Sequence, residues 1–110
     1  MNALKNRVQL IGHVGGDPEV KDFEKGRKRA VLNLATNDVY KNDKGEKVEE
    51  TQWHRVIAWG KPAEIIEKYV NKGKEIAIEG KLTHKTYEDK NGERRFLTEV
   101  VVSELLLLGK

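Results

Sequence analysis

The segment TQWHRVIAWGK, residues 51–61, contains both tryptophans of a chain that has only seven aromatic residues. Residues of equal parity share one face of a strand, so Trp53, Arg55 and Trp59 lie on the same side. The alternate positions include valine and alanine, which suit the crowded interior of a small barrel. If those positions face inward, two indoles that flank a guanidinium face the solvent. Exposed indoles stack on unpaired nucleic-acid bases at roughly 1–3 kcal/mol per base, and neighbouring cations neutralise the phosphates.

The opposite register, with both indoles in the core, is the alternative, because tryptophan is usually largely buried. Three observations count against it. Burying Arg55 beside the indoles would leave a costly unpaired charge. Lys61 follows Trp59 with the same parity, and Tyr40 and Tyr87 each stand at the edge of a polar loop. We therefore expect the tryptophans to face outward, on a surface that prefers single strands because a duplex hides its base faces.

Catalysis and metal binding have little support in the residue pattern. His13, His54 and His84 are separated by 41 and 30 residues, and the chain has no cysteine to complete a four-ligand zinc site. Ser103, the only serine, has no apparent base. GHVGGDP lacks the Lys-Ser/Thr ending of a phosphate-binding loop. We expect no metal, no cofactor and no enzymatic activity.

Composition indicates a small protein of the cytoplasm. The 110 residues are enough for one domain, 1–110, and contain no apolar run of roughly 20 residues that could span a membrane. The N-terminus shows no signal segment. The net charge of +3 and the pI near 9.1 only weakly favour an anionic partner, because 21 basic residues nearly balance 18 acidic ones. The basic cluster KGRKR, residues 25–29, is equally compatible with phosphate contacts and with a solvated loop.

Period-2 patterns predict a mainly β protein with one helix. The helix covers KPAEIIEKYVNKG, with Pro62 near its start and Gly73 as its stop. Gly12 suggests a bulge or sharp bend in the first strand, and the polar stretch 41–50 is expected to be a long flexible loop. The order β-β-β-α-β-β predicts a five-stranded OB-fold barrel. The expected strands lie near residues 7–15, 30–35, 51–59, 76–82 and 94–107.

Several longer segments resemble the bacterial-type single-stranded DNA-binding proteins. The resemblance runs in order from about Asn6 to Val102, and the WHRV and KG…EG blocks together are far more specific than any single short motif. It is carried by LIGHVGGDPEV, LNLAT, TQWHRVIAWGK, YVNKGKEIAIEGKL and TEVVV. It implies a protein that catalyses nothing, uses no cofactor and coats single strands exposed in DNA replication, recombination and repair.

The same resemblance implies roles for particular residues and a homotetramer built from paired dimers. The stacking positions match Tyr40, Trp53, Trp59 and Tyr87. The cations along the DNA path match Arg55, Lys61, Lys72 and Lys85, and Lys74 lies beside Lys72 across Gly73. The dimer interface involves the first strand, with Asn6, Val8 and Leu10, together with His54, for which an interior position is the other possibility.

Three features depart from the family pattern. Tyr40 and Tyr87 stand where tryptophan is common, and Thr83 and Thr86 stand where a basic residue is common. The sequence ends at Lys110 without the disordered, acidic-tipped tail that recruits other proteins in this family, which puts such recruitment in doubt. An OB-fold module for structured RNA or for a protein partner is the competing interpretation, since this fold hosts many ligands.

Overall fold

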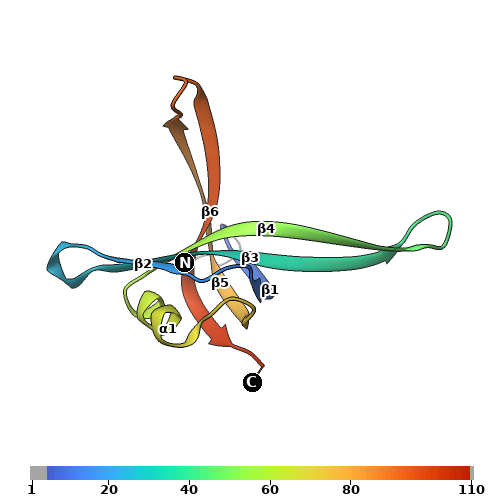
Figure 1. Ribbon diagram of the computed structural model, residues 1–110, viewed down its shortest axis with the longest axis horizontal. Helices are drawn as coiled ribbons and strands as arrows, with labels where there is room; N and C mark the ends of the chain where they lie inside the picture. Colours follow the sequence, from blue (N-terminus) through green and yellow to red (C-terminus); the bar gives the residue numbers. More distant parts are fainter. Residues whose placement is uncertain (1–4, 110) are drawn as a thin grey trace.

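Six strands form one sheet that closes on itself into a five-stranded barrel (Figure 1). The computed structural model describes residues 5–109. Neighbouring strands follow the order β1-β5-β6-β4-β3, and β1 pairs with β3 again through His13–Ala35 and Val14–Leu34, which closes the barrel. The predicted OB-fold barrel is therefore confirmed. The elements are β1 (Val8–Val14), β2 (Glu19–Asp22), β3 (Lys28–Lys41), β4 (Lys47–Trp59), α1 (Lys61–Tyr69), β5 (Glu75–Glu88) and β6 (Arg94–Leu107).

The short strand β2 was not predicted from the sequence. It pairs antiparallel with the start of β3, from Glu19–Val31 to Asp22–Lys28, and a 3-10 turn at Glu24–Gly26 joins the two strands. Its four residues, EVKD, contain one apolar side chain, too few to show a period-2 pattern. Strand β2 therefore extends the sheet outside the barrel as the outer half of a β2–β3 hairpin.

The interior of the barrel contains the alternate side chains of β4, as the sequence pattern predicts. Val56 and Ala58 are completely buried. They pack in one cluster with Leu34 and with Ala63 and Ile66 of α1. The helix is shorter than expected, because it ends at Tyr69, and Gly73 (φ 89°) lies in the turn that follows. This core fixes which face of β4 points to solvent.

Two glycines allow backbones to approach where the barrel changes partner or curvature. A Cβ on Gly12 would lie 2.2 Å from the carbonyl oxygen of Ala35, where β1 passes from β5 to β3. The β1–β5 register is continuous across Gly12, so the bulge suggested there is not found. The register shift lies instead at Glu79 and Gly80 of β5, where β6 has one residue more. A Cβ on Gly80 would lie 2.1 Å from the carbonyl oxygen of Val101.

Two hairpins project well beyond the barrel (Figure 1). The expectation of a long flexible loop at residues 41–50 is wrong, because β3 and β4 stay paired out to Lys41–Lys47 and only a short turn joins them. The second arm is formed by β5 and β6, paired out to Glu88–Arg94. The radius of gyration is 16.1 Å, against roughly 13 Å for a compact domain of this length. The arms therefore enlarge the surface of a small protein.

Within residues 5–109, no helix combines the length and the apolar character needed to cross a membrane.

Gly80→Ala should destabilise the fold by about 1–3 kcal/mol, because the added methyl group meets the backbone of β6. Gly16→Ala is the matched control, since a Cβ there would have no heavy atom within 4 Å. We expect that variant to stay within about 0.5 kcal/mol of the parent. Urea unfolding at fixed protein concentration measures both values. Equal unfolding midpoints for the two variants would contradict the close approach at Gly80.

Candidate nucleic-acid interface

Both tryptophans lie on the outer surface of β4, as predicted. The exposed fraction is 61% for Trp53 and 36% for Trp59. Ile57 has the same parity but is buried, because it lies in register between Val31 of β3 and Val101 of β6. We call this surface the Trp face, defined by the outward residues of β3, β4, β6 and β5 that share a register. They are Arg29, Val31, Asn33, Ala35, Trp53, Arg55, Ile57, Trp59, Arg95, Leu97, Glu99, Val101, Lys81, Thr83, Lys85 and Tyr87.

Trp53 rests against the turn that follows β1. A Cβ on Gly15 would lie 2.3 Å from the Cζ3 atom of the Trp53 ring, so only glycine allows this approach. Gly15 is held in place by the hydrogen bond that its amide donates to the carbonyl of Asn33 at 2.9 Å. One edge of the indole is therefore supported, while most of the ring remains open to solvent.

The turn containing Lys72 and Lys74 is anchored to the same end of β1. The amide of Gly73 donates to the carbonyl of Val14 at 2.7 Å, and the amide of Val14 donates to the carbonyl of Lys74 at 2.9 Å. The amide of Lys72 also donates to the Oδ1 atom of Asp17 at 3.0 Å. Since Gly15 follows Val14 directly, these bonds bring the two lysines to the Trp53 end of the Trp face.

A buried carboxylate lies in the middle of the Trp face. Glu99 is only 2% exposed, and its Oε2 atom accepts a hydrogen bond from the Nε atom of Arg55 at 2.7 Å. Its Oε1 atom is 3.3 Å from the Nζ atom of Lys85 but accepts no hydrogen bond within residues 5–109. Sequence reasoning missed Glu99. An acidic residue next to the apolar run VVV was the available signal, because a buried carboxylate requires cationic partners.

Trp59 lies within a cluster of rings and cations. The Phe23 and Trp59 ring centroids are 5.6 Å apart at an interplanar angle of 38°. The Cζ atom of Arg27 lies 4.7 Å from the Trp59 centroid, and that of Arg29 lies 5.2 Å from the Phe23 centroid. Phe23 was not among the predicted site residues, because nothing in the sequence showed that the β2–β3 hairpin folds toward the end of β4.

The predicted tyrosines lie on the two arms. Tyr87, on β5, shares the Trp face with Lys85, and its side chain is half exposed. Tyr40 is also half exposed, but it pairs with Val48 and so has the parity of the barrel interior, opposite to the Trp face. The most exposed aromatic ring that the structure describes is Phe96, at 78%, which pairs with Thr86 on the other face of its arm.

The residues predicted for the subunit interface occupy different environments. Val8 and Leu10 pack against the core, so their side chains point into the barrel. Asn6 exchanges two hydrogen bonds with the backbone of Leu82, at 3.0 and 3.1 Å, which continues the β1–β5 pairing. His54 is partly buried, and its Nε2 atom lies 2.9 Å from the Oγ1 atom of Thr36.

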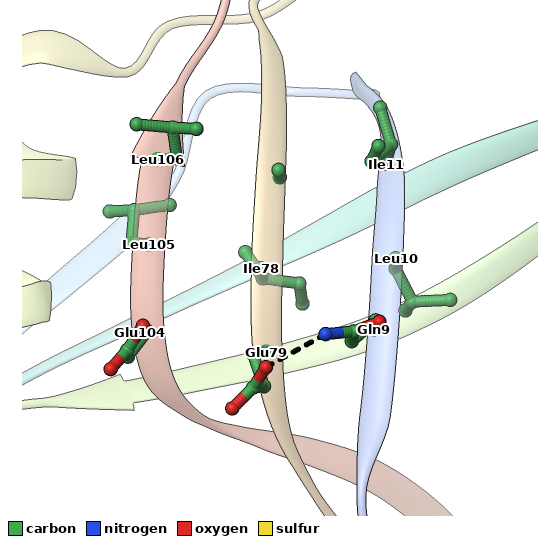
Figure 2. A pocket seen from close by; sticks show the side chains of 9 residues that line it. Gln9, Leu10, Ile11, Ile78, Glu79, Glu104, Leu105 and Leu106 are labelled. Atoms are coloured by element: carbon green, nitrogen blue, oxygen red, sulfur yellow. Dashed lines mark hydrogen bonds between the residues drawn. The ribbon is translucent and has the colours of Figure 1, made fainter.

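A shallow hollow lies on the outer surface of the β1–β5–β6 sheet (Figure 2). Its volume is about 420 Å³. One end is apolar, with Ile11 and Leu106 each 62% exposed and in register with Ala77 between them. At the other end, the carboxylate of Glu79 accepts hydrogen bonds from Gln9, which has the larger effect, and from Arg7. These bonds hold the pKa of Glu79 below its usual value. Sequence reasoning missed the apolar row formed by Ile11, Ala77 and Leu106, because these three residues come from three separate strands.

The remaining predicted cation, Lys61, is exposed at the first residue of α1. Among the residues that the structure describes, no group of three or more His, Asp and Glu side chains could hold a metal ion.

A family profile decides the assignment of the chain. The profile of the "Single-strand binding protein family" matches residues 5–108. The chain belongs to this family. The family consists of non-enzymatic DNA-binding proteins, which confirms the expectation that the chain is not an enzyme.

Curated members of the family show the same relationship along most of the chain. Single-stranded DNA-binding protein 1 of Chlorobaculum tepidum is 40% identical over 105 residues, which cover 94% of this chain and 65% of that protein. Single-stranded DNA-binding protein 1 of Xylella fastidiosa is 40% identical over 109 residues, covering 98% of this chain and 80% of that protein. The chain thus spans about two thirds of the first relative's length.

Solved structures of family members have the same fold. A chain from the Plasmodium falciparum SSB complex with ssDNA aligns with a TM-score of 0.88 at 30% identity, covering 99% of this chain and 100% of that chain. A deletion mutant of the single-stranded DNA-binding protein from Thermus aquaticus aligns with a TM-score of 0.81 at 30% identity, covering 94% of this chain and 50% of that one.

Arg55→Ala should lower the free energy of unfolding by about 1–3 kcal/mol, because it removes the hydrogen-bonded partner of a buried carboxylate. Lys85→Ala is the matched control. Its side chain is 63% exposed and its ammonium group lies farther from Glu99, so the loss should stay below about 1 kcal/mol. Urea unfolding of both variants at one protein concentration measures the difference. A larger loss for Lys85→Ala would mean that Arg55 is not the main partner of Glu99.

Proposed function

We propose that the protein binds single-stranded DNA across the Trp face and coats strands exposed in replication, recombination and repair. The observation that carries this proposal is the outward orientation of two indoles on either side of a guanidinium. An exposed ring offers a flat face to any base, so binding tolerates different sequences. Family membership and the likeness to a chain solved in complex with ssDNA support the choice of ligand.

Individual roles follow from the chemistry of each side chain. Trp53 and Trp59 are about 20 Å apart along β4, at roughly 3.3 Å per residue, and each stacks on a different base. Tyr87 stacks where the path continues onto the β5–β6 arm, and Tyr40 stacks where the strand passes around the β3–β4 arm. The phosphates are neutralised by Arg55, Lys61, Lys72, Lys74 and Lys85. The protein acts in the cytoplasm, associated with the nucleoid, in line with its bacterial relatives.

Trp53→Ala should weaken binding of oligo-dT roughly 5- to 150-fold, which corresponds to the loss of about 1–3 kcal/mol of stacking. Tyr69→Ala is the matched control, because Tyr69 is an equally exposed ring that lies on α1, outside the Trp face. Fluorescence anisotropy of a labelled oligonucleotide measures both affinities, and circular dichroism verifies folding. Equal losses for the two variants, or equal affinity of the parent for duplex DNA, would contradict the proposal.

We also propose a homotetramer, a dimer of dimers, built on two different surfaces of the β1–β5–β6 sheet. Along residues 8–12, the edge of β1 that faces away from β5 has no partner strand within residues 5–109. An open edge pairs readily with a second copy. The apolar row formed by Ile11, Ala77 and Leu106 is a second surface that favours burial. Two self-complementary surfaces related by different two-fold axes generate a tetramer.

In this arrangement Asn6, Val8 and Leu10 act through the position and backbone of β1. His54 supports the interface from β4, where Thr36 orients its ring.

Ile11→Glu should halve the oligomer, because a carboxylate in the apolar row opposes packing between dimers while the β1 edge remains intact. Light scattering of the parent should give about 50 kDa, four times the chain mass of 12.6 kDa, and the variant about 25 kDa. Val39→Glu is the matched control, since Val39 is also an exposed aliphatic residue but lies on the β3–β4 arm. A parent mass of one chain, or an unchanged mass for Ile11→Glu, would refute this assembly.

A further inference from the structure

We propose that the β2–β3 hairpin is an additional DNA-binding segment, in which Arg27 covers the indole of Trp59 in the free protein and moves to a phosphate of single-stranded DNA when a base stacks on that ring. This inference rests on the proposed function and assigns a ligand contact to a segment that contains none of the stacking rings and cations assigned under that function. The hairpin lies at the opposite end of the β3–β4 strand pair from the projecting β3–β4 arm (Figure 1).

The two tryptophans present different surfaces to a ligand. Most of the Trp53 ring is open to solvent, whereas Trp59 is only 36% exposed. The guanidinium of Arg27 lies 4.7 Å from the centroid of Trp59, and Phe23 packs against the same ring at 5.6 Å. A base can therefore stack fully on Trp59 only if one of these neighbours moves.

Arg27 is the neighbour that can move. Its contact with the indole is a cation–π contact at an exposed site, which is weak. Phe23 makes more contacts, because its ring also lies against the cations of Arg29 and Lys21. An arginine can form two parallel hydrogen bonds with a phosphate, and these are stronger than its cation–π contact with a ring. DNA therefore offers Arg27 a better partner than Trp59 does.

The β2–β3 hairpin carries two arginines whose charge is not shared with a carboxylate of the described residues. Within residues 5–109, neither Arg27 nor Arg29 has a carboxylate within ion-pairing distance, and the Nε atom of Arg29 has no hydrogen-bond partner. Lys28, between them, is paired with Glu67 and Asp22. In the middle of the Trp face, by contrast, Arg55 and Lys85 share the buried Glu99.

The position of the hairpin is continuous with the proposed DNA path. Arg29 of β3 is in direct register with Trp59 of β4, so the hairpin begins where the Trp face ends. A strand that stacks on Trp53 and Trp59 reaches the Arg27 side chain next.

The experiment uses Trp53→Phe as the parent. Because the chain has two tryptophans, Trp59 is then the only source of tryptophan fluorescence. Arg27→Ala, Arg27→Lys and Lys25→Ala are compared in that background. Lys25 is the matched control, because it lies in the same turn and, among the described residues, makes no cation–π contact with Phe23 or Trp59. Acrylamide quenching measures access to Trp59 in the free protein, and titration with oligo-dT at several salt concentrations measures affinity and its salt slope.

Without DNA, both Arg27 variants should make Trp59 more accessible to acrylamide. Arg27→Ala should weaken oligo-dT binding about three- to tenfold at moderate salt and reduce the slope of log K against log salt by roughly 0.7, the value for one phosphate contact. Arg27→Lys should keep the parent's slope, because its charge remains. Lys25→Ala should change affinity by less than about twofold.

If Arg27→Ala has the same oligo-dT affinity and the same salt slope as Lys25→Ala, the role of the hairpin is overturned. The proposed function still stands in that case, provided that the Trp53→Phe parent binds oligo-dT. An unchanged Trp59 signal at saturating oligo-dT would overturn the exchange at the ring. Failure of both the parent and the unmutated protein to bind oligo-dT would overturn the proposed function itself, and this inference with it.

Discussion

The alternation of side chains along β4 is the constraint on which the rest of the molecule depends. Val56 and Ala58 are completely buried between the other strands and α1. Because successive residues of a strand point to opposite faces, their burial forces Trp53 and Trp59 outward. A slip of one residue would place two indoles and a guanidinium in the core and expose the small residues. The same packing that stabilises the barrel therefore creates the Trp face.

Charge on this surface is distributed unevenly, and a single buried carboxylate is the cause. Glu99 neutralises much of the field of Arg55 and Lys85 at the centre of the Trp face. On the β2–β3 hairpin, by contrast, Arg27 and Arg29 have no carboxylate within ion-pairing distance among residues 5–109. A formal net charge of only +3 is thus compatible with local attraction at the hairpin end of the Trp face, because local charge rather than the total attracts a polyanion.

The projecting hairpins show how a 110-residue chain obtains a large exposed surface. Two pairs of 13- and 14-residue strands continue past the barrel, so their outer halves are stabilised by pairing rather than by a core. Tyr40 and Tyr87 are placed on these arms, away from the two indoles. Since Tyr40 has the opposite parity to the Trp face, a strand that contacts all four rings must bend around the molecule. The proposed contacts with all four rings therefore favour a flexible single strand over a stiff duplex.

Much of this protein could be read from its sequence, because local patterns depend on neighbouring residues. The period-2 pattern of residues 51–59 determined the strand and the outward direction of the indoles, and Pro62 and the apolar spacing after it determined a helix. The order of elements then determined the OB-fold barrel.

Other features depend on residues far apart in the chain and were decided by the tertiary structure alone. Glu99 meets Arg55 across a parallel strand pair, Phe23 reaches Trp59 through a folded hairpin, and Ile11 aligns with Leu106 through β5. The pairing of residues 41 and 47 was missed for a related reason: polar side chains hide a hairpin that backbone hydrogen bonds maintain. Sequence patterns report which face of an element is buried, whereas only strand register and chain crossing determine which distant side chains meet.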